Sequence, residues 1–262
     1  DGERTVIGIK ASSDVTDCVG SDLFVIATKA SAVGMAAGAI KPYVVANTIV
    51  LTIQNGLGAG DRIAAHLPTE NVLLGVADGF GASMKGPGHV HHNAMKLIRL
   101  GEMSGGRSDR LEDLEGIWQG AGFNARAFED IHQLIWEKLL CNVTLSAPCS
   151  VFDCNVGELR NSPEHWSIAL GCMQEAYQCG LAAGIGFSFD DPHSYVTAFA
   201  DMMPGANPSM RLDHFAKRRS EIDFINGAIP ALGVFYNIAT PYNQTLSAIV
   251  RDIENRFEGA EI

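Results

Sequence analysis

The sequence predicts an α/β domain built on a parallel sheet, followed by an all-α domain. Three short apolar runs alternate with helix-like intervals, and they occupy residues 22–30, 48–56 and 71–82. From about Phe128 onward, apolar residues recur at three-to-four spacing instead. Strand–helix alternation favours a parallel sheet with crossover helices, and the later pattern favours packed helices. We therefore expect a sheet domain over residues 1–128, a helical domain over residues 129–262, and a ligand cleft between them.

The strands of the sheet domain can be assigned in chain order. The runs "DLFVIATKA" and "TIVLTIQNG" are both apolar and rich in β-branched residues, as buried parallel strands are, and a helix-like interval separates them. The third run, "NVLLGVADGFGA", follows a short helix expected around residues 61–66. The Gly-Pro-Gly of residues 86–88 marks a turn, and "KLIRLGE" at 96–102 predicts a further strand.

Composition excludes several classes of protein. The 262 residues carry a formal net charge of -11, which argues against binding to a nucleic-acid backbone. No apolar run approaches the ~18 residues that a membrane span needs. The six cysteines contain no CxxC pair, which favours reduced thiols. The sequence therefore predicts a cytoplasmic protein that binds neither nucleic acid nor membrane.

Two polar motifs follow the first two strands, where open α/β sheets bind their ligands. Lys29 ends the first strand, and "QNGLG" at 54–58 ends the second. Lys29 is either a ligand contact or a surface lysine that extends its charge into solvent. Asn55 with its glycines either approaches a ligand or forms an ordinary strand-to-helix turn. The glycine spacing of "GLGAG" is not the G-x-G-x-x-G dinucleotide fingerprint.

A second polar pattern lies in the apolar stretch "IWEKLLCNVTLSAP" of the helical domain. Lys138, Asn142 and Ser146 recur every four residues, so one helix face presents an ammonium, an amide and a hydroxyl in a row. Such a row suits a polar substrate. The alternative is a solvated helix face, and spacing alone leaves both interpretations open.

A charged segment near the C-terminus, "PSMRLDHFAKRRSEIDFING", has two interpretations. It is either an amphipathic helix with pairs such as Lys217–Glu221, or a helix that turns Glu221 toward the cleft.

His89 and His91 share one face of an expected strand, where they form either a metal pair or a polar strand face. No third ligand stands at a suitable spacing, so we predict no metal. The sequence also contains no nucleophile-elbow arrangement typical of hydrolases.

Seven motifs stand in the order and at about the spacing of one family: "KA" after a strand, "QNGLG", "GPGHVHH", "WEKLLCN", "GEL", "SEIDFING" and "TPYNQTL". Along nearly its whole length the chain resembles the ketopantoate reductases. The resemblance implies a Rossmann-type parallel sheet domain followed by an all-α helical domain. It also implies reduction of 2-dehydropantoate (ketopantoate), a 2-oxo acid, to pantoate with NADPH, a step toward pantothenate and coenzyme A.

The resemblance assigns roles to individual residues. Lys138 matches the family's proton donor, and Asn55 matches the asparagine that bridges substrate and nicotinamide. The substrate-binding residues implied in this way are Asn55, Lys138, Asn142, Ser146 and Ser209. The cofactor-binding residues are Lys29, Asn55, Ala82 and Glu221.

The chain also departs from the family pattern. Ser146 and Val156 stand where other members have asparagine, so the substrate pocket is expected to differ. The family's G-x-G-x-x-G turn and the basic residue for the 2'-phosphate are absent, and the resemblance places roughly 45 residues of a first βαβ unit, the N-terminal part of the Rossmann domain, upstream of Asp1.

Three alternatives to this function are left open by the sequence. One is an opine- or 3-hydroxyacid-type dehydrogenase, another a non-catalytic dinucleotide-binding protein, and the third a structural or interaction protein. The resemblance also implies a homodimer through the helical domain, but the sequence does not fix the oligomeric state.

Overall fold

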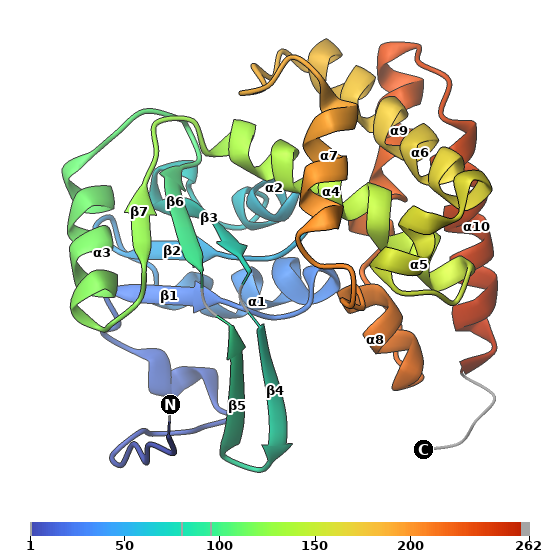
Figure 1. Ribbon diagram of the computed structural model, residues 1–262. Coiled ribbons are helices and arrows are strands. Elements are labelled where there is room, and N and C mark those ends of the chain that lie inside the picture. The colour runs from blue at the N-terminus through green and yellow to red at the C-terminus, as the bar shows by residue number, and fades with distance from the viewer. Residues whose placement is uncertain (1, 80, 95, 258–262) are drawn as a thin grey trace.

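The computed structural model describes residues 2–79, 81–94 and 96–257, and in them a sheet part joins a helical part (Figure 1). The main sheet has the order β1-β2-β3-β6-β7. Its strands are β1 (Leu23–Ile26), β2 (Ile49–Thr52), β3 (Val72–Asp78), β6 (Leu97–Glu102) and β7 (Ala125–Ala127). β1, β2 and β3 are parallel, as the sequence predicted. β6 runs antiparallel to β3 because a hairpin, and not a crossover helix, connects the two.

Helices cover both faces of this sheet. α1 (Val33–Ile40) and α2 (Ala59–Ala64) pack on one face, in a core that contains Phe24, Val50 and Leu74. α3 (Asp109–Gly120) covers the other face through Leu111 and Leu114. The sequence pattern did not predict α3 or β7, because α3 is rich in charge and buries few of its residues.

The predicted strand over residues 71–82 is wrong, because the chain divides it in two. β3 ends at Asp78, and β4 (Gly81–Gly86) pairs with β5 (His89–Ala94) in a separate two-stranded sheet. Gly79 has φ +54°, a left-handed conformation that turns the chain out of the main sheet. Residue 80, which the same prediction included, lies outside the described residues. The hairpin projects from the sheet at the bottom of Figure 1.

The helical part is arranged around α4 (Ile131–Val151), which runs from the sheet into the helix bundle (Figure 1). Asp130 accepts a hydrogen bond from the Gln133 amide and so caps the first turn. The other helices are α5 (Val156–Asn161), α6 (Pro163–Ala182), α7 (Pro192–Asp201), α8 (Ser209–Phe215), α9 (Ala228–Tyr236) and α10 (Pro241–Asn255). Leu139, Leu140 and Val143 of α4 are fully buried among them.

The helix predicted through Glu221 ends early. α8 stops at Phe215, and Lys217 adopts φ +52°, with the Arg218 amide bonded to the Asp213 carbonyl as in a left-handed C-terminal cap. Lys217 and Glu221 therefore do not form the predicted i,i+4 pair. The Lys217 ammonium lies over the Phe257 ring instead.

Two predictions about domains and membranes can be compared with these elements. Every strand in the described ranges ends by Ala127, although the predicted boundary at 128/129 stays a prediction. Within the described ranges, no helix combines the length and apolar character needed to cross a membrane. All six cysteines are free thiols.

Candidate functional site

One cavity of about 310 Å³ lies where the carboxyl end of the sheet meets the helical part; we call it the site cavity. Its lining includes all five residues that the sequence analysis named as substrate-binding: Asn55, Lys138, Asn142, Ser146 and Ser209. They come from the loop after β2, from α4 and from the first residue of α8. Three separate elements therefore bring them to one cavity, which is partly open to solvent.

The row on α4 faces this cavity as the four-residue spacing predicted. Lys138, Asn142 and Ser146 all line it, while their neighbours Leu139, Leu140 and Val143 pack into the helical core. The solvated-face alternative is wrong, since Ser146 is 3% exposed and the other two are half-buried. A polar stripe on an otherwise buried helix thus faces the site cavity.

The Lys138 ammonium lies in a position suited to a proton donor. Its Nζ donates a 2.7 Å hydrogen bond to the Ala77 carbonyl at the end of β3. Burial lowers the pKa of Lys138 below its usual 10.5, opposed by Asp78 and reinforced by Arg99. A lysine with a lowered pKa releases its proton more readily than an exposed one.

The side-chain amides of Asn55 and Asn142 have no hydrogen-bond partner among the described residues. The backbone around Asn55 is fixed, because Gln54 donates from Nε2 to the carbonyls of Ile26 and Thr28, at 2.7 and 3.0 Å. Since side-chain amides normally find partners, these two are available to a ligand.

The site cavity also has apolar side chains in its lining, which we call the apolar wall. They are Ile53, Ala77, Leu145, Val156, Phe199, Met203, Ala206 and Pro208. Val156 replaces a family asparagine, and Phe199 and Met203 stand one turn apart on and just after α7. Sequence reasoning missed these two, although their spacing would place them on one helix face. The cavity thus combines a polar row with an apolar wall.

Lys29 and Glu221 lie outside this lining, where β1 meets the helical part. Lys29 Nζ pairs with Asp213 Oδ2 at 2.6 Å, and the Ala30 amide donates to Glu221 Oε1 at 2.9 Å. The Lys29 side chain is still 50% exposed. Sequence reasoning missed Asp213, which stands one helical turn after Ser209 on α8.

Ala82 lies apart from the other predicted site residues. It sits on β4, paired with His92 in the hairpin sheet, and it does not line the site cavity. The turn at Gly79 places Ala82 in this separate sheet and not on the strand that the sequence predicted over residues 71–82. Its predicted contact with the cofactor stays a prediction.

The residues present fit the nicotinamide end of a dinucleotide. The unpartnered Asn55 amide lies at the carboxyl end of β2, and the half-exposed Lys29 ammonium lies at the carboxyl end of β1. Amide and ammonium groups are suitable donors to a ribose, a carboxamide or a phosphate. Lys29, Asn55 and Glu221 would hold this half of the cofactor.

His89 and His91 are both exposed on β5, as expected of a polar strand face. Within the described ranges, no three histidine, cysteine or acidic side chains gather as metal ligands would. The absence of a metal stays a prediction.

Comparison with known proteins identifies relatives of the whole chain. A family model described as "Ketopantoate reductase PanE/ApbA" matches residues 2–105, and its C-terminal counterpart matches residues 130–254. The 2-dehydropantoate 2-reductase of Streptococcus pyogenes serotype M6 is 30% identical over 231 residues, which are 88% of this chain and 75% of that protein.

Solved structures agree with these matches. The 2-dehydropantoate 2-reductase of Geobacter metallireducens superposes with a TM-score of 0.88 at 27% identity, over 96% of this chain and 83% of that one. A D-mandelate dehydrogenase bound to NADH and anilino(oxo)acetate superposes with a TM-score of 0.80 at 26% identity, over 90% and 77%. The family models together span both parts of the fold, and the chain belongs to the ketopantoate reductase family.

Proposed function

We propose that this protein is a 2-dehydropantoate 2-reductase, which reduces the ketone of 2-dehydropantoate to the alcohol of pantoate with NADPH. The reaction belongs to the synthesis of pantothenate and coenzyme A, and we place it in the cytoplasm. The observation that carries the proposal is the convergence of Asn55, Lys138, Asn142, Ser146 and Ser209 on the site cavity.

The chemistry follows from the position of Lys138. When bound, the reduced nicotinamide supplies hydride to the ketone carbon. Negative charge develops on the ketone oxygen, and an ammonium directed at that oxygen stabilises the charge and transfers one proton to it. Lys138 ends the step as a neutral amine, a form that its burial already favours.

The other lining residues bind and orient the 2-oxo acid. Asn142, Ser146 and Ser209 offer donors to the carboxylate and hydroxyl of the substrate. Leu145, Val156 and the α7 side of the cavity present apolar surface to the two methyl groups on its quaternary carbon. Polar row and apolar wall thus match the two chemical sides of 2-dehydropantoate.

The test is NADPH oxidation, followed by absorbance, with the full-length protein and 2-dehydropantoate beside other 2-oxo acids. We expect rapid oxidation of NADPH with 2-dehydropantoate, and the same assay with NADH measures the cofactor preference, which the sequence leaves open. Activity only on another 2-oxo acid would support a 2-oxo acid reductase and rule out 2-dehydropantoate as its substrate. A protein that binds the dinucleotide and turns over no substrate would be the non-catalytic alternative.

The apolar wall favours one second candidate, a reductase of a bulkier apolar 2-oxo acid. Val156 replaces an asparagine whose side-chain amide would bind a substrate hydroxyl, and Phe199 adds an aromatic surface to the cavity. The D-mandelate dehydrogenase neighbour was solved with an aromatic 2-oxo acid derivative. A higher kcat/KM for phenylglyoxylate than for 2-dehydropantoate would select this candidate.

A homodimer through the helical part completes the proposal. Val234 and Phe235 of α9 are 85% and 78% exposed, which is unusual for large apolar side chains on a helix. Sedimentation of the wild type beside Phe235→Ser tests it: loss of a dimer in the variant supports the interface, and a wild-type monomer rejects it.

A further inference from the structure

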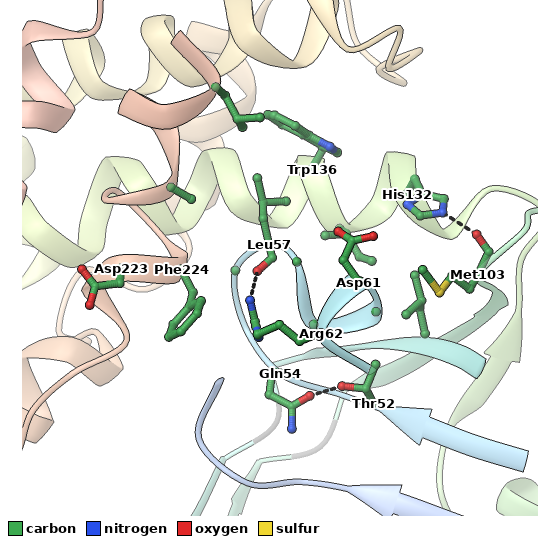
Figure 2. Close-up of a pocket in the computed structure, with 18 of the residues that line it drawn as sticks. Thr52, Gln54, Leu57, Asp61, Arg62, Met103, His132, Trp136, Asp223 and Phe224 are labelled. Carbon is green, nitrogen blue, oxygen red and sulfur yellow. Dashed lines mark hydrogen bonds between the residues drawn. The ribbon is translucent and has the colours of Figure 1, made fainter. Parts of the chain in front are cut away.

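A three-residue contact joins the loop after β2, which carries Asn55, to the helical part (Figure 2). The Leu57 amide donates to the Phe224 carbonyl at 2.9 Å, and Arg62 Nη1 donates to the Leu57 carbonyl at 3.2 Å. The Arg62 guanidinium also lies over the Phe224 ring, 4.2 Å from its centroid. We call Leu57, Arg62 and Phe224 the clasp.

The clasp fixes the loop at Leu57, two residues after Asn55. The backbone of Gly56, which lies between Asn55 and Leu57, has little freedom to move. Gly56 has φ +82°, and a Cβ at this position would overlap the Phe224 carbonyl. On the other side of Asn55, the Gln54 amide is bonded to two carbonyls. The Asn55 backbone is therefore anchored on one side to the sheet and on the other to the helical part.

Stability alone does not explain Arg62. Its Nε and Nη2 atoms are shielded from solvent and have no hydrogen-bond partner among the described residues. A buried charged group with unpaired donors is destabilising, and burial lowers the pKa of Arg62 accordingly. The one hydrogen bond that Arg62 does make fixes the carbonyl of Leu57, in the loop that carries Asn55.

We propose that Arg62 is a positioning residue, which acts through Leu57 and Phe224 to hold the Asn55 amide in register with Lys138 across the domain boundary. The inference rests on the proposed function for its kinetic consequence only. Asn55 belongs to the sheet part and Lys138 to α4, so a contact that spans both parts sets their separation. Small displacements of positioned groups lower turnover strongly.

The first experiment replaces the guanidinium with an apolar chain of similar length. Arg62→Met removes the hydrogen bond to the Leu57 carbonyl, and it also removes the unpaired Nε and Nη2 donors. We expect kcat to fall about tenfold or more, with a smaller loss of dinucleotide affinity because Asn55 is also expected to contact the cofactor, and with a melting temperature equal to or above wild type. Arg62→Lys, which keeps a donor for the Leu57 carbonyl, should recover part of kcat.

The matched control is Arg107→Met, because Arg107 also donates to a backbone carbonyl, that of Ala127, at 3.0 Å, and does not line the site cavity. We expect wild-type turnover from this control. Wild-type turnover in Arg62→Met would overturn the inference. So would a parallel loss of melting temperature and activity, because that is the signature of a purely structural residue.

The second experiment needs no turnover, so its outcome is independent of the proposed function. Hydrogen exchange of the segment 54–58 should speed up in Arg62→Met and in Phe224→Leu, and the double variant should show no further increase, since both act on one contact. An unchanged exchange rate in both variants would reject the clasp. If wild type fails to reduce 2-dehydropantoate while exchange responds as expected, the proposed substrate fails and the clasp stands.

Discussion

Two cavities flank the Asn55 loop, and they differ in how their polar groups are used. The site cavity measures about 310 Å³, and a second one, the rear cavity of Figure 2, measures about 490 Å³ between α2, α4 and α9. In the rear cavity, Gln54 is bonded to carbonyls and His132 Nε2 to the Met103 carbonyl. In the site cavity, the amides of Asn55 and Asn142 have no partner among the described residues.

Unpartnered side-chain amides, rather than size, therefore distinguish the site cavity from the rear cavity. A folded protein normally pairs its enclosed donors and acceptors, because leaving one unmade costs about 1–3 kcal/mol. The amides of Asn55 and Asn142 in the site cavity are therefore available to a ligand. The larger rear cavity has apolar side chains such as Leu57 and Trp136 in its lining. Its one side-chain amide among the described lining residues, that of Gln54, is bonded to backbone carbonyls, and its Arg62 belongs to the clasp.

The largest effect is expected at Lys138. Lys138→Ala should lower kcat by about 10²–10⁴-fold, because the developing oxyanion loses both its counter-charge and its proton source. Dinucleotide affinity, measured by fluorescence titration, should hardly change, since the lysine acts mainly in the transition state. Lys41→Ala, at an exposed lysine after α1, is the control. Equal losses of kcat and dinucleotide affinity would contradict the assigned role.

The pH dependence of kcat gives a second test of Lys138 as the proton donor. Lys138 donates its proton only when charged, and its pKa lies below 10.5, so kcat should decline as pH rises, with a midpoint below that of an exposed lysine. Neighbouring Cys141 stays a neutral thiol here, because burial raises its pKa to about 12. Asp78→Asn removes a charge that raises the Lys138 pKa, and should move the midpoint to lower pH. A midpoint that does not move would assign the titration to another group.

The α4 row and the parallel strands could be predicted because both depend on local periodicity. Residues 138, 142 and 146 share a helix face whatever surrounds the helix, and β1, β2 and β3 are each a short apolar run. Asn55 was predictable because it follows a buried parallel strand directly.

The remaining features depend on contacts between distant segments. Asp213 pairs with Lys29 across 184 positions, and Phe224 meets Leu57 from the other part of the fold. The end of α8 depends on a left-handed Lys217, a conformation that lysine has no intrinsic preference for. The turn at Gly79 divides one apolar run into the strands β3 and β4. The pattern of apolar residues alone predicted a single strand there.

A smaller effect is expected at Asn142. Asn142→Ala removes one neutral donor to a charged substrate, a bond worth about 1.5–3 kcal/mol, so kcat/KM should fall about 10–100-fold. Asp61→Asn is the matched change in the rear cavity, where the exposed Asp61 side chain makes no hydrogen bond to a described residue. Its kcat/KM should stay within about twofold of wild type, because a surface charge outside the site contributes little. Equal losses of kcat/KM in the two variants would contradict the assignment of substrate binding to the site cavity alone.

The smallest effect is expected from partly filling the rear cavity. Ala231 lines it from the exposed side of α9, so Ala231→Leu can extend into empty space without displacing a buried partner. We expect turnover within about twofold of wild type and an unfolding free energy within about 0.5 kcal/mol, as for other exposed substitutions. Denaturant unfolding and steady-state kinetics on the same preparation measure both. A tenfold change in turnover without a change in stability would mean that occupancy of the rear cavity is transmitted through the clasp to Asn55. The larger cavity would then be a regulatory site, and satisfied polar groups would no longer separate it from the functional one.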